Sequence, residues 1–183
     1  MAKIILVTGG SRSGKSQYAQ RAAEALPGPR AFIATCPDID EEMQQRIRRH
    51  QEARRGKGWH TIEEPLNIEN AIRSAHAFPT LVIDCLTLWV NNLLYEANTT
   101  NKTVSEADMV ARCGELIAAC DNHPGTIVFV TNEVGMGIIP EHPLSRLYRD
   151  LVGRCNQTMA ALSQRVVLLI AGQPIEIKKE ELS

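Results

Sequence analysis

Short runs of apolar residues alternate along this chain with stretches in which apolar residues recur at helical spacing. Runs rich in β-branched residues predict strands at Lys3–Thr8, Arg30–Thr35, Trp59–Ile62, Thr80–Asp84, Thr126–Thr131 and Val166–Ala171, with an edge strand at Ile175–Lys178. Helical patterns cover Ser16–Leu26, Asp38 to about Arg55, Asn67–His76, Leu86–Tyr95, Ser105 to about Cys120, and Leu144–Ser163. Apolar strands separated by helices predict an α/β fold, with a mostly parallel sheet covered by helices on both faces.

The segment between the first strand and the first helix matches the phosphate-binding pattern G-x-x-x-x-G-K-[ST]. Its residues are Gly9, Gly10, Ser11, Arg12, Ser13, Gly14, Lys15 and Ser16. The glycines let backbone N–H groups point at phosphate oxygens, and the N-terminus of the next helix adds partial positive charge. We expect Lys15 to reach the β- and γ-phosphates and the Ser16 hydroxyl to ligate Mg²⁺. The strand, the motif and the helix follow one another directly along the chain. This order predicts a P-loop NTPase-type fold.

The apolar strand Thr80–Asp84 ends in a carboxylate, as a Walker B strand does. Asp84 at this position suits Mg²⁺, bound either directly or through water. The alternative is that Asp84 caps the helix that follows. In such sheets ligands bind beyond the carboxyl ends of the strands. The P-loop and Asp84 therefore predict a nucleoside triphosphate with Mg²⁺, but they do not identify the reaction.

The helical stretch that ends near Arg55 is strongly basic. One of its faces, at helical spacing, carries Met43, Arg46, Ile47, His50 and Arg54. His50 thus shares a partly apolar stripe with an arginine one turn to either side. A histidine there could attack phosphorus as a nucleophile while the arginines neutralise developing charge. Two alternatives stay open: a solvated arginine face with a surface histidine, or a nucleic-acid patch.

Composition narrows the function classes. The chain has 183 residues, which fits one domain over residues 1–183. Its net charge of −1 and its 4% aromatic content argue against a dedicated nucleic-acid-binding protein. The apolar runs are far shorter than the roughly 20 residues of a membrane span, and the N-terminus does not resemble a signal peptide. An odd number of cysteines, five, without a C-x-x-C pair argues against disulfides or structural zinc and predicts a cytoplasmic protein.

A Gly- and Pro-rich segment, residues 132–143, follows a core strand and is predicted to be a long loop. Long loops at the carboxyl end of a strand are functional more often than not. The helix after this loop carries a polar face that either binds substrate, makes a subunit contact or is simply solvated: Arg149, Asp150, Arg154, Asn156 and Gln157.

Six segments, taken together and in order, resemble a known family over nearly the whole chain. They are I-L-V-T-G-G-S-R-S-G-K-S, R-I-R-R-H-Q-E-A-R-R, W-H-T-I-E-E-P, V-I-D-C-L-T-L-W-V-N-N-L-L, V-T-N-E-V-G-M-G-I-I-P and R-D-L-V-G-R-C-N-Q. The chain resembles the bifunctional adenosylcobinamide kinase / adenosylcobinamide-phosphate guanylyltransferase family of cobalamin biosynthesis. A P-loop alone is widely shared, whereas this combination is specific.

The resemblance implies two reactions. ATP or GTP phosphorylates adenosylcobinamide, and GTP then guanylylates an enzyme histidine that passes GMP to adenosylcobinamide phosphate, giving adenosylcobinamide-GDP. The family's guanylylated histidine falls on His50, and Lys15 is the second catalytic residue. Beyond the P-loop, the resemblance places Ala34, Thr35, Cys36, Gln51, Glu52, Ala53, Arg54, Asp84 and one of Glu63 and Glu64 at the nucleotide. It also implies a homo-oligomer, with a trimer as one form.

The residues leave other functions open. A monofunctional P-loop small-molecule kinase would keep Lys15 and Asp84 but form no covalent adduct. A non-catalytic nucleotide switch would bind nucleotide without turnover. The corrinoid pocket is not located by the sequence, and the loop 132–143 and the helix of His50 are the candidates for it.

Overall fold

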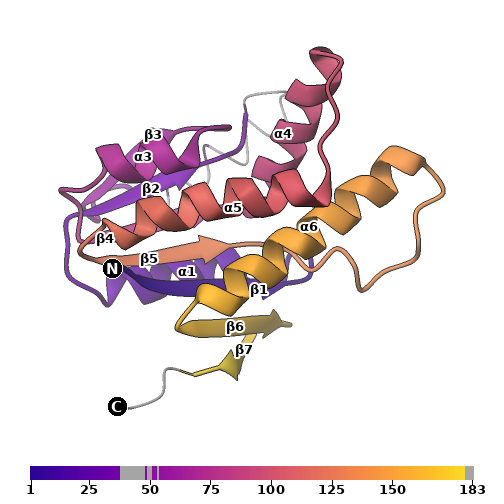
Figure 1. Cartoon of the computed structure of the whole chain (residues 1–183). Helices are drawn as coiled ribbons and strands as arrows, with labels where there is room; N and C mark the ends of the chain where they lie inside the picture. Colours follow the sequence, from indigo (N-terminus) through magenta and orange to yellow (C-terminus); the bar gives the residue numbers. More distant parts are fainter. Residues whose placement is uncertain (38–47, 49–50, 53, 180–183) are drawn as a thin grey trace.

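The computed structural model describes residues 1–37, 48, 51–52 and 54–179, and its central element is a seven-stranded sheet (Figure 1). The strands are β1 (Lys3–Gly9), β2 (Arg30–Ala34), β3 (Trp59–Glu63), β4 (Thr80–Asp84), β5 (Thr126–Val130), β6 (Arg165–Ile170) and β7 (Gln173–Lys178). They lie in the order β3-β2-β4-β5-β1-β6-β7. The pairs among β1 to β6 are parallel, and β7 pairs antiparallel to β6 at the edge. The predicted mostly parallel sheet is confirmed.

Helices connect the strands and cover both faces. Among the described residues they are α1 (Lys15–Glu24), α3 (Ile68–Ser74), α4 (Leu86–Thr99), α5 (Glu106–Asp121) and α6 (Pro143–Leu162). Helix α1 packs on β1, β4 and β5, while α5 packs between α3 and α6, and α4 contacts α6. In Figure 1 helices α5 and α6 lie in front of the sheet and α1 lies behind it.

Alternation along each strand divides the core in two. Leu6, Ile33 and Ile83 belong to the cluster beneath α3 to α6, while their neighbours Val7 and Phe32 belong to the cluster beneath α1. Both sets are almost completely buried. Strands buried on both faces appear in a sequence as continuous apolar runs. The strand positions predicted from the sequence therefore agree closely with those in the structure.

The structure moves several predicted boundaries. Residues predicted to open a loop at Glu96 continue α4 to Thr99, and α6 begins at Pro143 rather than at Leu144. The final turn lies at Ala171 and Gly172, and Pro174 is already inside β7. Among the described residues, no helix combines the length and the apolar content that a membrane crossing needs.

Candidate active site

The glycine-rich segment makes a tight turn between β1 and α1. Gly9 has φ +144°, and a Cβ there would lie 2.4 Å from the carbonyl oxygen of Leu169 on β6, so only glycine fits. Gly14, the N-cap of α1, has φ +97°. Lys15 is buried, and its Nζ donates to the Gly10 carbonyl oxygen at 2.5 Å and to Ser13 Oγ at 3.4 Å. The ammonium therefore lies inside the turn, where phosphate oxygens bind in a P-loop.

The P-loop segment contacts the far edge of the sheet as well as α1. The P-loop residues Gly9 to Ser16 are contiguous, with Ser11 and Arg12 exposed and Ser16 half-buried at the start of α1. The Ser13 carbonyl accepts the Gly172 N–H at 3.0 Å. This hydrogen bond joins the phosphate turn to the turn between β6 and β7.

Asp84 ends β4, which is separated from β1 by β5 alone. The helix that follows has Cys85 as its N-cap and no side-chain cap bond, so the alternative of a capping Asp84 is not supported. The side chain of Thr35 binds both backbone groups of Cys85, the residue after Asp84. Its hydroxyl donates to the Cys85 carbonyl and accepts from the Cys85 N–H, both at 2.8 Å. The Thr35 carbonyl accepts from Asn92 Nδ2 at 2.8 Å. Thr35 is fully buried and positions the Asp84–Cys85 junction.

The donor set suits Mg²⁺. The Ser16 hydroxyl and the Asp84 carboxylate supply oxygen atoms, which Mg²⁺ prefers over nitrogen or sulfur. Over the described ranges, no cluster of three or more His, Cys, Asp or Glu side chains could hold a metal ion by itself. A magnesium ion here would complete its shell with phosphate oxygens and water, as is usual for nucleotide complexes.

Arg54 is the unusual charged group of the site. Its side chain is 4% exposed, and its guanidinium carbon lies 3.7 Å from the centroid of the Phe32 ring on β2. Its buried Nε and Nη1 atoms have no hydrogen-bond partner in the described part of the chain. Burial lowers the pKa of Arg54, and the Asp84 carboxylate opposes that shift. A buried guanidinium with unused donors is costly unless an anion joins it.

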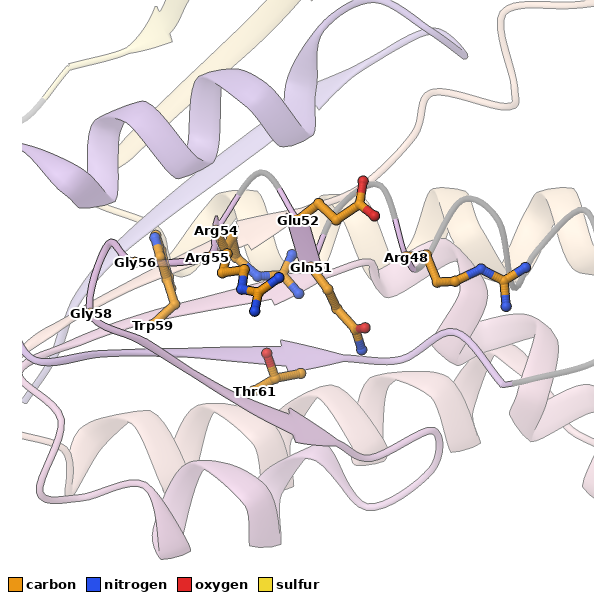
Figure 2. Close-up of a pocket in the computed structure, with 9 residues that line it drawn as sticks. All are labelled: Arg48, Gln51, Glu52, Arg54, Arg55, Gly56, Gly58, Trp59 and Thr61. Carbon is orange, nitrogen blue, oxygen red and sulfur yellow. The ribbon is translucent and has the colours of Figure 1, made fainter.

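A cavity of about 460 Å³ adjoins Arg54, within the size range of small-ligand sites. Its described lining residues are Arg48, Gln51, Glu52, Arg54, Arg55, Gly56, Gly58, Trp59 and Thr61. Figure 2 shows Gln51 pointing toward the strand that carries Thr61, whereas Glu52 points away from it. The cavity thus opens between the basic segment and β3.

A tether fixes the end of this basic segment to α1. The Glu24 carboxylate accepts from Trp59 Nε1 at 3.3 Å and pairs with Lys57 Nζ at 3.3 Å. Trp59 also meets the Phe32 ring edge-on, with centroids 6.2 Å apart. These contacts place the Arg54 turn on the face of the sheet that α1 covers.

The two adjacent glutamates have different surroundings. Glu64 Oε1 accepts the backbone N–H groups of Leu66 at 3.0 Å and Asn67 at 2.8 Å, where α3 begins. Glu63 ends β3, is exposed and pairs in register with Ala34, which itself pairs with Asp84. Glu64 therefore has a structural partner, and Glu63 stands at the same sheet edge as Asp84.

The remaining predicted residues divide into two groups. Ala34 ends β2 and pairs in register with Asp84, and Cys36, two residues further along the chain, is half-buried. Gln51 and Glu52 are exposed on the helical turn of Arg54. His50 and Ala53 lie outside the described residues.

One cluster was not predicted from the sequence. Thr8 Oγ1 donates to Glu133 Oε1 at 2.7 Å, and Asn156 Nδ2 donates to the same oxygen at 3.1 Å. The Glu133 N–H donates to the Gly9 carbonyl at 3.1 Å. The sequence pointed to the loop and to Asn156 separately. Their meeting at the P-loop depends on contacts more than 100 residues apart, which local patterns do not reveal.

The fold has relatives among solved structures. The flagellar accessory protein FlaH from Methanocaldococcus jannaschii matches with a TM-score of 0.55 over 97% of this chain and 79% of that chain, at 11% sequence identity. At this identity the likeness concerns the fold alone. It agrees with the α/β architecture predicted from the strand and helix pattern.

Sequence comparisons reach further. Three bifunctional adenosylcobalamin biosynthesis proteins match nearly end to end: CobP of Pseudomonas aeruginosa is 41% identical over 97% of this chain and 98% of its own, CobU of Salmonella typhimurium is 40% identical over 96% and 99%, and CobU of Escherichia coli is 38% identical over 96% and 99%. The family model described as cobinamide kinase / cobinamide phosphate guanyltransferase matches residues 5–177. These matches confirm the family predicted from the motifs: the chain belongs to the cobinamide kinase / cobinamide phosphate guanyltransferase family.

Proposed function

We propose that this chain phosphorylates adenosylcobinamide with ATP or GTP and then transfers GMP from GTP, through a guanylylated His50, to adenosylcobinamide phosphate. The product is adenosylcobinamide-GDP. The observation that carries the proposal is the family match over residues 5–177, joined to a P-loop whose buried Lys15 lies inside the turn.

In the kinase step, the P-loop holds the triphosphate. Lys15 and the N–H groups at the start of α1 neutralise charge on the β- and γ-phosphates as the γ-phosphoryl moves to the substrate hydroxyl. Ser16 and Asp84 would hold Mg²⁺, which would offset phosphate charge when bound. Thr35 keeps Asp84 in place through its two bonds to Cys85.

In the transfer step, a neutral imidazole of His50 attacks the α-phosphorus of GTP. A nitrogen–phosphorus bond forms, and the bond to pyrophosphate breaks. The phosphate oxygen of adenosylcobinamide phosphate then attacks the same phosphorus and releases the histidine. An imidazole attacks phosphorus only in its neutral form, because protonation removes the lone pair of the attacking nitrogen.

Arg54 and its cavity support nucleotide contacts on this side of the sheet. Nε and Nη1 of Arg54, which have no hydrogen-bond partner among the described residues, suit a phosphate or another anionic group. Glu63 is the better of the two glutamates for a nucleotide contact, because Glu64 already accepts two backbone N–H groups. The proposed nucleotide-binding set is completed by six further residues: Ala34, Thr35, Cys36, Gln51, Glu52 and Ala53.

The corrinoid is proposed to lie along the loop 132–142. Its exposed side chains include Met136, Ile138 and Ile139, which are 80%, 95% and 66% exposed. The loop contacts the P-loop where it begins, through the Glu133 N–H and the Gly9 carbonyl, and its exposed apolar side chains suit a large, partly apolar substrate. We also propose a homo-oligomer, which the family resemblance implies, and a cytoplasmic location, which the cysteine usage predicts.

The histidine is tested by trapping the adduct. Incubation with α-labelled GTP and Mg²⁺ is expected to label the chain with an acid-labile, hydroxylamine-sensitive GMP. The label should be absent in His50→Ala and present in His60→Ala, since His60 is an exposed residue of β3 stacked on Phe78. Undiminished labelling of His50→Ala would assign the nucleophile elsewhere. Phosphorylation without labelling of the wild type would leave a monofunctional kinase.

A further inference from the structure

A carboxylate of the loop after β5 stands against the first residue of the P-loop. Glu133 donates its backbone N–H to the Gly9 carbonyl at 3.1 Å, and the next carbonyl, of Gly10, accepts Lys15 Nζ at 2.5 Å. Strand β5 lies between β1 and β4. Glu133 is therefore placed between the phosphate turn on one side and the Asp84 edge on the other.

The Glu133 carboxylate is held in one orientation. Thr8 Oγ1 and Asn156 Nδ2 both donate to Oε1, at 2.7 and 3.1 Å. Asn156 is buried and bridges further, because its Nδ2 donates to the Asn132 carbonyl at 3.0 Å and its Oδ1 accepts from Thr131 at 2.7 Å. The loop is also pinned to α4, since Asn132 Nδ2 donates to Thr87 Oγ1 at 2.8 Å. A group fixed by this many partners is preorganised.

The fold does not require the negative charge. Thr8 Oγ1 and Asn156 Nδ2, which donate to Oε1, are both neutral groups. A glutamine would accept the same two bonds without the cost of desolvating a carboxylate.

We infer that Glu133 is the general base of the kinase step, an inference that rests on the proposed function. The acceptor hydroxyl oxygen forms a bond to the γ-phosphorus as the bond from that phosphorus to the β,γ-bridging oxygen breaks. The hydroxyl proton passes to the Glu133 carboxylate, and the nucleoside diphosphate leaves with the electron pair. Guanylylation of a neutral histidine releases no hydroxyl proton, so Glu133 serves one of the two reactions only.

The test compares Glu133→Gln with wild type in the full chain. The substitution keeps an oxygen that accepts from Thr8 and Asn156, so the melting temperature is expected to stay the same. Phosphoryl transfer from γ-labelled ATP or GTP to adenosylcobinamide should fall about 10²–10⁴-fold in kcat. Labelling by α-labelled GTP should proceed at the wild-type rate. Glu96→Gln, at an exposed position of α4, is the matched control and should retain both activities.

A conservative variant separates a base from a scaffold. Glu133→Asp keeps a carboxylate and should recover part of the phosphorylation that Glu133→Gln loses, while its guanylylation stays at the wild-type rate. Full kinase activity in Glu133→Gln, or equal losses of phosphorylation and guanylylation, would overturn the inference. A wild-type chain that does not phosphorylate adenosylcobinamide would instead refute the proposed function itself, so the two failures are distinguishable.

Discussion

At the scale of single residues, Arg54 shows a conflict between stability and binding. Its guanidinium is buried against the Phe32 ring while two of its N–H-bearing atoms lack partners in the described part of the chain. Leaving a charged donor unsatisfied costs roughly 1–3 kcal/mol or more, whereas a cation over a ring recovers about 1–2 kcal/mol. The arrangement is reasonable if a bound anion takes up the unused donors.

Replacing Arg54 by methionine tests this balance. We expect the nucleotide-free Arg54→Met variant to have an unchanged or higher free energy of unfolding, because methionine fills the site without unpaired donors. Its affinity for GTP should fall. Chemical denaturation and equilibrium binding measure the two effects, and Arg73→Met, an exposed residue of α3, is the control. A clear loss of stability in the nucleotide-free Arg54→Met protein would show that the guanidinium serves the fold.

At the scale of elements, α5 shows a helix start that the sequence predicts correctly. Ser105 is its N-cap, and the Asp108 N–H donates to Ser105 Oγ at 3.2 Å. Asp108 Oδ2 accepts from the Ser105 N–H at 2.8 Å and from its hydroxyl at 2.6 Å. These bonds lower the pKa of Asp108. The two residues form a reciprocal capping box.

Ser105→Ala is expected to lower the free energy of unfolding by about 1 kcal/mol at neutral pH. A carboxyl group whose pKa is lowered by folding contributes stability above its unfolded pKa and loses it as the pH falls through the folded pKa. The difference between variant and wild type should therefore shrink in acid. Denaturation at neutral and acidic pH measures it, with Thr103→Ala in the preceding loop as the control. A difference that grows in acid would contradict the role of Asp108.

Sequence patterns placed the buried strands well because strands covered on both faces are marked locally by apolar, β-branched runs. The end of α4 was missed because Glu96–Thr99 is polar. The Thr100 hydroxyl donates back to the Glu96 carbonyl at 2.9 Å, which supports the last turn. The edge strand was predicted to begin at Ile175, yet β7 already includes Pro174, because an edge strand tolerates a residue without an N–H donor.

The candidate site also contains features that a local sequence pattern marks and features that depend on tertiary contacts. The P-loop and Asp84 are readable from the sequence, since each is a short segment at a strand end. Three other features depend on tertiary contacts. They are the packing of Arg54 on Phe32, the hydrogen bonds between Thr35 and Cys85, and the hydrogen bond from Thr8 to Glu133. No local periodicity encodes such contacts, so these side chains required the fold.

At the scale of the whole molecule, nucleotide binding should couple the two sides of the site. The P-loop is hydrogen-bonded to the β6–β7 turn through Gly172 and to the loop after β5 through Glu133. The segment that follows Arg54 is joined to α1 through Glu24. A nucleotide that contacts both the P-loop and Arg54 would join these elements in one folded unit. Ligand that binds only the folded state then stabilises the entire chain.

Magnesium GTP at 100 times its dissociation constant is expected to add about 2.7 kcal/mol to the free energy of unfolding. For a chain of this length, that corresponds to a rise in melting temperature of about 5–10 °C. Lys15→Ala should lose most of the rise, because its ammonium lies inside the phosphate turn. Calorimetry with and without nucleotide measures it, and Lys102→Ala, an exposed lysine after α4, is the matched control. A full rise in Lys15→Ala would mean that the triphosphate is held mainly outside the P-loop, on the Arg54 side of the sheet.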